Sequence, residues 1–490
     1  MNILVINGSP KGQYSITLQT ILYLEKLHPE HTFTVLHAGQ RIKAYEKDFS
    51  AAAEAITQAD LLLFSYPVYT FIAPSQLHRF IELMKEHEIP VVGKYATQVT
   101  TSKHFYDITA HRYIQDNCQD MGMKFVRGLS ADMDDLLTDK GQQEAEQFWQ
   151  HLLWCMEQDY AEPCYYAPTH SVAAPATSNS TPHNATPSFG DAIISQTSAQ
   201  ITESSSHTNT VSADVISPIP KEEKKGDVVI VTDCRPNDIQ LANMIARFQA
   251  VLPLKTRIVN LHEYPFMGGC LGCFKCAADG MCVYKDGFDT FLREKIQKAQ
   301  AIIYAFTIKD HSMGSRFKMY DDRQFCNGHR TVTVGMPVGY LISGRFSAET
   351  NLQMILEGRA QVGENILAGI ATDEINPNAG IDRLAASLIY ALEHHNTQPQ
   401  NFYGVGGMKI FRDLIYQMQG MMKADHRFYK AQGHYDFPQK KKGLIIKMYL
   451  VGALLSSPKL KAKLGNKMNE GMLMPYRKLF EQLDAKTTKK

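Results

Sequence analysis

The sequence predicts an α/β protein with two doubly wound domains in tandem and a helical tail. From residue 1 to about 158, five short apolar runs alternate with helical patterns, and the same alternation returns between 227 and 395. The stretch between them, 162–225, is rich in Ser, Thr, Ala, Asn and Pro and lacks a sustained apolar period. We therefore expect one domain at 1–160, a disordered linker at 161–226, a second domain at 227–397 and a basic helical region at 398–490.

The first domain has the pattern of a five-stranded parallel sheet with helices on both faces. Strands are expected at 2–6, 32–36, 60–65, 95–101 and 124–129. Helical patterns occupy 15–27, 51–59, 74–87, 107–121 and 141–156. Because a helical run separates consecutive strands, the connections are crossovers, which are right-handed in nearly all parallel sheets.

The second domain repeats this arrangement. Strands are expected at 227–232, 255–261, 300–306, 337–343 and 365–372. Helical patterns occupy 239–252, 288–299, 316–325, 352–363 and 381–395. The sequence therefore predicts a second five-stranded parallel sheet.

Charge and composition argue against several classes of protein. The 51 basic and 50 acidic residues give a net charge of +1, so we expect no nucleic-acid partner and a small substrate instead. The sequence opens directly on an apolar strand-like run, and no apolar run reaches the length of a spanning helix, which predicts a cytoplasmic protein. Nine cysteines in such a compartment do not predict a disulfide framework.

A Gly- and Ser-rich turn, NGSPKGQYSIT, follows the first strand and opens a helix. Backbone N–H groups and the helix dipole favour a phosphate at such a place. The candidate phosphate-binding residues are Ser9, Lys11, Ser15 and Thr17. The spacing matches neither a dinucleotide fingerprint nor a Walker loop, so a single phosphate suits it better. A helix-capping turn without any ligand is the alternative.

An aromatic loop follows the third strand and contains Pro67, Tyr69 and Phe71. At the carboxyl edge of a sheet, beside a phosphate turn, these side chains can form a wall for a planar ring. The alternative is that Tyr69 and Phe71 pack on the neighbouring helix. Thr101 and Ser102, at the end of the fourth strand, are candidate donors to the polar edge of the ring.

These two loops resemble those of the flavodoxin-like NAD(P)H-dependent flavin and quinone reductases, from residue 1 to about 158. That family has a GSP phosphate turn and a P-V-Y loop followed by a helix like APSQLHRFIELM. The resemblance implies bound FMN, with its phosphate on Ser9 to Thr17 and its ring against Pro67, Val68, Tyr69, Thr70 and Phe71. It also implies NAD(P)H as electron donor. The flavin carries the chemistry in such enzymes, so no catalytic side chain is named.

Four cysteines lie close together after the second strand of the second domain: Cys270, Cys273, Cys276 and Cys282. Three thiols at successive intervals of three, with a fourth close behind, can wrap a compact [4Fe–4S] cluster. Structural zinc more often uses two C-x2-C pairs separated by a longer loop. We favour the cluster, with zinc and a redox-active thiol set as alternatives.

The cysteine motif resembles that of the iron–sulfur flavoproteins, which hold FMN near a [4Fe–4S] cluster. The resemblance covers about 227–395 and places Ser343 and Gly344 in the loop that contacts the flavin ring. The sequence departs from the family in both flavin loops, TDCRPNDIQ and FTIKDHSMGSRFK, which lack the GSP turn and the proline and aromatics. Our hypothesis is one FMN in the first domain and one cluster in the second. A second FMN in the second domain is the alternative.

The sequence is thus read as an iron–sulfur flavoprotein that passes electrons to a flavin, quinone or protein acceptor. Two other readings stay open: an electron carrier without enzymatic activity, and a flavin reductase with a structural zinc site. The resemblance also implies a homo-oligomer. For the basic tail we favour a packed helical hairpin with a solvated lysine face over contact with an anionic membrane surface.

Overall fold

The computed structural model describes residues 1–164, 226–395 and 397–456, with a few further residues between 473 and 485. The linker predicted at 161–226 lies almost entirely outside the described residues. Contacts divide the chain into two compact units, Met1–Asp425 and His426–Lys490. Both predicted doubly wound domains belong to the first unit.

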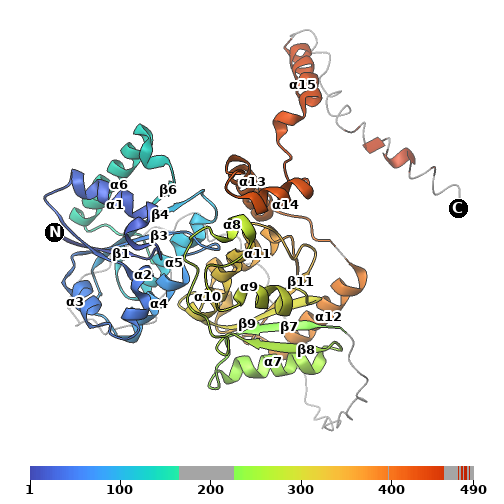
Figure 1. Cartoon of the computed structure of the whole chain (residues 1–490), viewed down its shortest axis with the longest axis horizontal. Helices are drawn as coiled ribbons and strands as arrows, with labels where there is room; N and C mark the ends of the chain where they lie inside the picture. The colour runs from blue at the N-terminus through green and yellow to red at the C-terminus, as the bar shows by residue number, and fades with distance from the viewer. Residues whose placement is uncertain are drawn as a thin grey trace, which may run out of the picture. The chain divides into compact units, whose positions relative to one another are not determined.

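Two parallel sheets form the framework of this unit, and both have the flavodoxin-like strand order 2-1-3-4-5 (Figure 1). The first sheet runs β2-β1-β3-β4-β5, with β6 also paired to β4. The second runs β8-β7-β9-β11-β12, with β10 antiparallel to β9. The predicted fold class is therefore confirmed.

The first domain follows the predicted alternation. Its strands are β1 (Asn2–Asn7), β2 (Thr32–Leu36), β3 (Leu61–Pro67), β4 (Tyr95–Ser102), β5 (Lys124–Phe125) and β6 (Leu129–Asp132). Its α-helices are α1 (Ile16–Leu27), α2 (Ala38–Tyr45), α3 (Ser50–Gln58), α4 (Ser75–Glu86), α5 (Asp107–Asp120) and α6 (Asp139–Glu157). Because the strands are parallel, the loops that follow them lie at one edge of the sheet, where they can carry functional residues.

The second domain has the same order of elements. Its strands are β7 (Val228–Thr232), β8 (Thr256–Asn260), β9 (Ala301–Lys309), β10 (Ser312–Met313), β11 (Pro337–Ser343) and β12 (Ile366–Thr372). Its α-helices are α7 (Ile239–Val251), α8 (Cys276–Asp279), α9 (Phe288–Phe291), α10 (Ser315–Arg323), α11 (Thr350–Val362) and α12 (Pro377–His394).

The structure differs from the sequence predictions at several elements. The strand expected at 124–129 is split into β5 and β6. Between them, Gly128 lies so close to β4 that an added Cβ would stand 2.3 Å from the carbonyl oxygen of Gln98. The helix expected at 288–299 is a short α9 followed by one π-helical turn, Leu292–Ile296. Helix α2 was not predicted.

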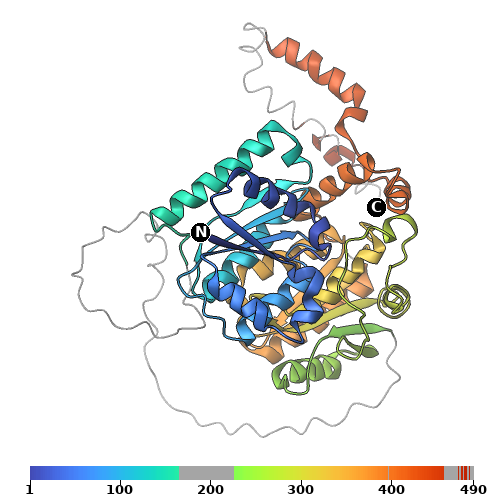
Figure 2. The ribbon, with the colours of Figure 1, turned by 60° about the vertical axis from the view of Figure 1, so that its left-hand side comes forward.

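The outer faces of the two sheets have separate cores. Helices α1 and α6 cover one face of the first sheet (Figure 2). Trp149 of α6 is fully buried there, with its ring 5.5 Å from that of Phe33 of β2. Helices α7 and α12 cover the corresponding face of the second sheet around Phe248. The alternating strand residues supply these cores, since every second side chain points to the same face.

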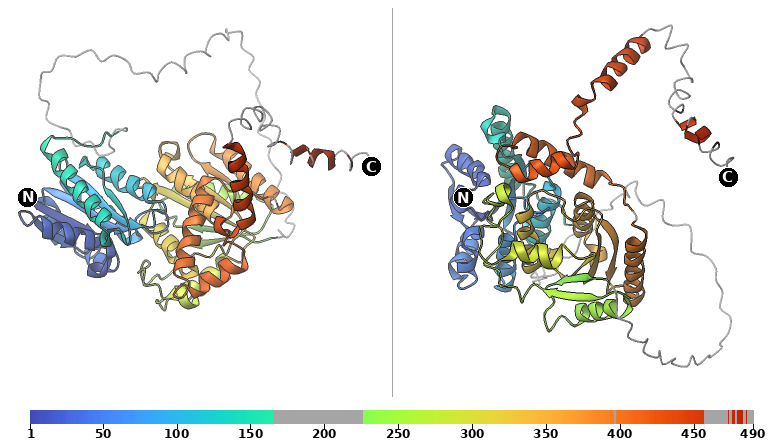
Figure 3. Two further views of the ribbon diagram at one scale, coloured as in Figure 1. Left: turned by 90° about the horizontal axis from the view of Figure 1, so that it is seen from above. Right: turned by 45° about the vertical axis from the view of Figure 1, so that its right-hand side comes forward.

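The inner faces share one core that runs through both domains. Helices α4 and α5 of the first domain pack on α10 and α11 of the second (Figure 3). Buried Phe80 and Tyr113 therefore belong to the same cluster as Phe317 and Tyr320. A shared apolar core fixes the relative placement of the two sheets within this unit.

Helices follow the second sheet, as predicted: α13 (Phe402–Gln417), α14 (Lys423–Ala431) and α15 (Lys442–Leu455). Helix α13 packs on α11. The apolar helix α15 exposes Ile446, Tyr449 and Leu450. The predicted hairpin extends into residues outside the described ones and stays a prediction. No helix among the described residues has both the length and the hydropathy needed to cross a membrane.

Candidate functional site

One cavity of about 420 Å³ collects most of the predicted site residues from both domains. From the first domain, all the candidate phosphate, ring and edge residues line it: Ser9, Lys11, Ser15, Thr17, Pro67, Val68, Tyr69, Thr70, Phe71, Thr101 and Ser102. From the second domain, it is lined by all four clustered cysteines: Cys270, Cys273, Cys276 and Cys282. Two sites predicted separately from the sequence therefore lie on one cavity.

The turn after β1 is held by its own polar side chains. The Asn7 side chain donates to the carbonyl oxygen of Gly12 at 2.9 Å and accepts from the Ser9 N–H at 3.1 Å. Ser15 caps α1 by accepting from the Leu18 N–H at 3.4 Å. The turn thus presents hydroxyl groups and the N-terminus of a twelve-residue helix at the cavity, which suits a phosphate group.

The turn and the end of β4 meet through their hydroxyl groups. The Oγ1 atoms of Thr17 and Thr101 lie 2.6 Å apart, and both side chains are buried. Ser102 Oγ accepts from the backbone N–H of His104 at 2.9 Å. Thr101 and Ser102 therefore stand where the sequence places donors for the polar edge of a ring.

The aromatic loop after β3 is a tight turn with an unusual backbone. Tyr69 and Ile72 form an antiparallel bridge, and the residues between them, Thr70 and Phe71, have φ of 44° and 76°. Side-chain-bearing residues rarely adopt such angles. Phe71 is 6% exposed, and its ring packs edge-on against Tyr106, with 4.3 Å between the ring centres. This agrees with the alternative in which Phe71 packs on the neighbouring helix. Tyr69 stays at the cavity wall.

The cysteine loop is anchored by a buried ion pair below it. Arg323 of α10 donates to both carboxylate oxygens of Asp286 at 2.7 and 2.8 Å and to the carbonyl oxygen of Gly268 at 2.9 Å. The two side chains are 1% and 2% exposed. Burial opposes the guanidinium charge, but the hydrogen bonds to Asp286 prevail and raise the pKa of Arg323. The guanidinium also lies 4.6 Å from the centre of the Tyr284 ring.

Contacts with the first domain hold the other side of the cysteine loop. The Gln76 side chain donates to the carbonyl oxygen of Cys270 at 3.1 Å, and Lys11 Nζ lies 5.1 Å from the centre of the Phe274 ring. Gly272 has φ of 59°, and a Cβ added there would stand 1.8 Å from the Tyr69 hydroxyl. The cysteine loop therefore touches both flavin loops of the first domain directly.

The thiols influence one another but do not form a ready metal site. Burial raises the pKa of Cys270 well above its usual range and that of Cys276 to about 11, and neighbouring cysteines add to both effects. In the described part of the chain, no three His, Cys, Asp or Glu side chains converge in a way that could hold a metal ion. The donor set suits a soft metal or a cluster, and the thiols would have to draw together to bind one.

Ser343 and Gly344 do not line this cavity. The Ser343 hydroxyl donates to one Asp373 carboxylate oxygen at 2.5 Å, and the Gly344 N–H donates to the other at 2.9 Å. Both donors that a flavin ring could use are therefore engaged within the second domain.

Several cavity residues were missed by the sequence analysis. Arg323 belongs to a K-x3-D-R pattern on α10, together with Lys318 and Asp322, and one turn of helix separates the lysine from the aspartate. That spacing could have singled out a charged cluster. Phe411 and Leu414 of α13 and Met418, which directly follows it, also line the cavity, but their helical pattern carries no signal for a ligand.

Comparison with protein-family models finds a match in the first domain. Residues 1–152 match the family with a flavodoxin-like fold. This match spans less than a third of the chain and agrees with the strand order of the first sheet. No curated protein matches the chain.

Solved structures with similarity to this chain are low in sequence identity. General stress protein 14 from Treponema denticola, in complex with FMN, is 14% identical, covers 31% of this chain and 99% of its own, and gives a TM-score of 0.26. An FMN-dependent NADH-azoreductase from Bacillus anthracis, also in complex with FMN, is 11% identical, with 32% and 99% covered and a TM-score of 0.25. The flavoenzyme FerB, an NAD(P)H:(acceptor) oxidoreductase from Paracoccus denitrificans, is 15% identical, with 33% and 99% covered and a TM-score of 0.27.

The buried pair below the cysteine loop gives a testable prediction. We expect Arg323→Gln to lower the free energy of unfolding by roughly 3–5 kcal/mol, because Asp286 would stay buried without its partner. Arg257→Gln is the matched control, since it breaks an Arg–Asp pair of the same domain whose side chains are 33% and 40% exposed. That change should cost about 0–1 kcal/mol. Urea denaturation followed by circular dichroism measures both, and equal losses would contradict an anchoring role for Arg323.

Proposed function

We propose that the chain is an NAD(P)H-dependent flavin oxidoreductase that binds FMN in its first domain. Electrons would pass to a flavin, quinone or protein acceptor, and the four cysteines would form a second redox centre, a [4Fe–4S] cluster. One observation supports this proposal above all: the flavin loops of one domain and the four thiols of the other line the same cavity. NAD(P)H as donor follows from the family resemblance of the first domain.

Bound FMN would supply the hydride and single-electron chemistry, while the chain supplies binding and orientation. The turn at Ser9 to Thr17 would bind the phosphate, and the loop at Pro67 to Phe71 would support the ring. Thr101 and Ser102 would meet the polar edge of the ring. Phe411 and Leu414 of α13 add apolar surface to the wall, so the cavity can exclude water from the reacting face.

Two features favour one FMN per chain over two. The donors of Ser343 and Gly344 are engaged by Asp373. The first loop of the second domain also carries two acidic residues, Asp233 and Asp238, and lacks the hydroxyl groups of the first-domain turn. An acidic turn is a poor phosphate site compared with the hydroxyl-rich turn of the first domain.

The second candidate function is that of an electron carrier without enzymatic activity. An electron carrier would use the same flavin site but would take electrons from a partner protein. Oxidation of NADH or NADPH by the isolated protein would separate the two, because only the enzyme turns over without another protein. The homo-oligomeric state and the cytoplasmic location stay predictions.

The cofactor content tests the proposal directly. In protein purified without oxygen, we expect about one FMN, four iron and four sulfide per chain. Iron, acid-labile sulfide, zinc and FMN should be measured on one sample together with its absorbance spectrum. Zinc with FMN would leave a flavin reductase with a structural metal site. Absence of FMN would contradict the proposal as a whole.

A cysteine variant tests whether the thiols hold the second centre. Cys273 is exposed, so Cys273→Ala should leave the fold intact. We expect it to lose metal while retaining FMN, and to slow electron transfer to a one-electron acceptor on the order of tenfold or more. Cys234→Ala, at a half-buried cysteine of the same domain, is the matched control and should retain metal, FMN and activity. Unchanged metal content in Cys273→Ala would exclude the thiol as a ligand.

A further inference from the structure

The helices at the domain interface cap each other. Helix α4 begins at Ser75 after Pro74, and α10 begins at Ser315 after Gly314, and neither preceding residue caps its helix with a side chain. The Asp322 carboxylate of α10 accepts from the Ser75 N–H at 2.7 Å. In return, the Glu82 carboxylate of α4 accepts from the Ser315 N–H at 2.7 Å. Each helix N-terminus therefore obtains its capping anion from the other domain.

The loops before these two helices have the same backbone. The turn from Tyr69 to Ile72 corresponds to the turn from Lys309 to Ser312, which pairs in the same antiparallel manner. Asp310 and His311 have φ of 53° and 64°, again in the left-handed region. Such a turn in residues other than glycine is strained and persists only when its surroundings hold it.

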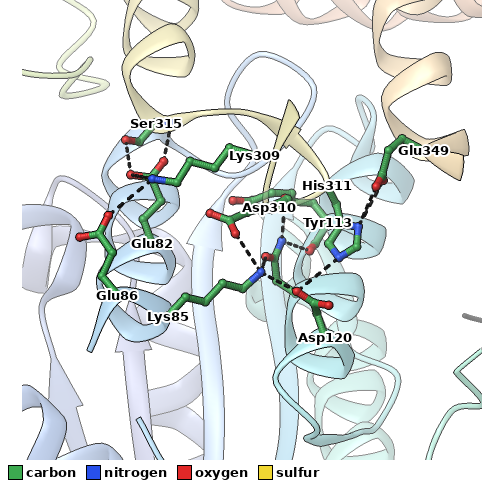
Figure 4. Close-up of polar contacts among 11 residues, drawn as sticks. Glu82, Lys85, Glu86, Tyr113, Asp120, Lys309, Asp310, His311, Ser315 and Glu349 are labelled. Atoms are coloured by element: carbon green, nitrogen blue, oxygen red, sulfur yellow. Dashed lines mark hydrogen bonds and ion pairs between the residues drawn. The ribbon is translucent and has the colours of Figure 1, made fainter. Parts of the chain in front are cut away.

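The two turns are held in different ways. In the second domain the charged side chains of the turn itself make contacts across the interface (Figure 4). Asn117 of α5 also donates to the carbonyl oxygen of Asp310 at 3.1 Å. Lys309 lies 3.3 Å from Glu82, and Asp310 lies 2.9 Å from Lys85. His311 lies 3.2 Å from Glu349 of its own domain and 3.9 Å from Asp120 of α5. This turn therefore ties the domains together with its own charges.

In the first domain, side chains outside the turn hold it. Thr109 of the same domain donates to the carbonyl oxygen of Phe71 at 2.5 Å, and α10 of the second domain supplies the other contacts. Lys318 Nζ donates to the carbonyl oxygen of Tyr69 at 2.9 Å, and the Thr70 hydroxyl donates to Asp322 at 3.2 Å. Lys318 and Asp322 also form an ion pair, and both side chains are fully buried. The contact with Lys318 uses the backbone of Tyr69, and the Tyr69 side chain lines the cavity. At the position of Lys318, α4 has His78, whose ring stacks on Tyr113 at 4.1 Å.

We propose that Lys318 and Asp322, in the second domain, are positioning residues for the flavin loop of the first domain. They hold Tyr69 and Thr70 in the strained turn against which the FMN ring would lie. This inference rests on the proposed FMN site. It gives the second domain a role in flavin binding that is independent of any metal at its cysteines.

Paired variants of the two capping acids test this role. We expect Asp322→Asn to raise the dissociation constant of FMN by about tenfold or more, because the charged contacts to the flavin loop are lost. Glu82→Gln removes the equivalent cap on the other helix and should leave the FMN dissociation constant within about twofold, although both variants lower the melting temperature. Apoprotein titrated with FMN gives the constant by fluorescence, and the flavin absorbance reports the surroundings of the ring.

Two milder variants keep the test decisive if Asp322→Asn does not fold. Thr70→Val removes only the hydroxyl that contacts Asp322 and should weaken FMN binding by a few-fold, about what one hydrogen bond contributes. Lys318→Arg keeps the charge and should preserve FMN binding better than Lys318→Met. Equal FMN affinity in wild type, Thr70→Val and Lys318→Met would overturn the inference, as would an equal loss in Glu82→Gln. Failure of the wild-type protein to bind FMN would instead overturn the proposed function.

Discussion

The structure depends on the reciprocal capping of α4 and α10 across the domain interface. Each helix starts with N–H groups that its own chain segment does not satisfy, and each receives a carboxylate from the facing helix. Because Ser75 and Asp322 are buried, water cannot replace the contact when the domains are packed. The interface therefore specifies one relative placement of the two sheets, and the apolar core between them then becomes continuous.

The same helix, α10, joins the interface to both loops of the cavity. Asp322 contacts the flavin loop of the first domain, and the next residue, Arg323, anchors the cysteine loop through Asp286. Burying so many charges is costly unless each has its partner, which explains why Arg359 reaches Asp321 at the same place. A single helix thus sets the distance between two loops that a parallel sheet alone would leave independent.

The sequence was sufficient to predict the two sheets but not the way they combine. Local alternation located every main strand and nearly every helix, because burial on both faces makes parallel strands continuous apolar runs. It also identified the turn at Ser9 to Thr17 and the four cysteines. The close approach of Gly128 to β4, beside the break in the last strand, is a tertiary contact that no local pattern records. The roles of Lys318 and Asp322 arise from contacts with residues some 250 positions away, such as Tyr69.

The equivalence of the two turns explains how one chain can contain one flavin loop and one structural loop. In both domains the two central residues of the turn have left-handed φ, and the side chains of the two turns differ. Where the turn carries Asp310 and His311, those charges reach across the interface and leave no apolar wall for a ring. Where it carries Thr70 and Phe71, the charged contacts come from α10, and both residues line the cavity. Two identical subunits would have to make both loops alike, whereas a tandem chain can assign binding to one loop and attachment to the other.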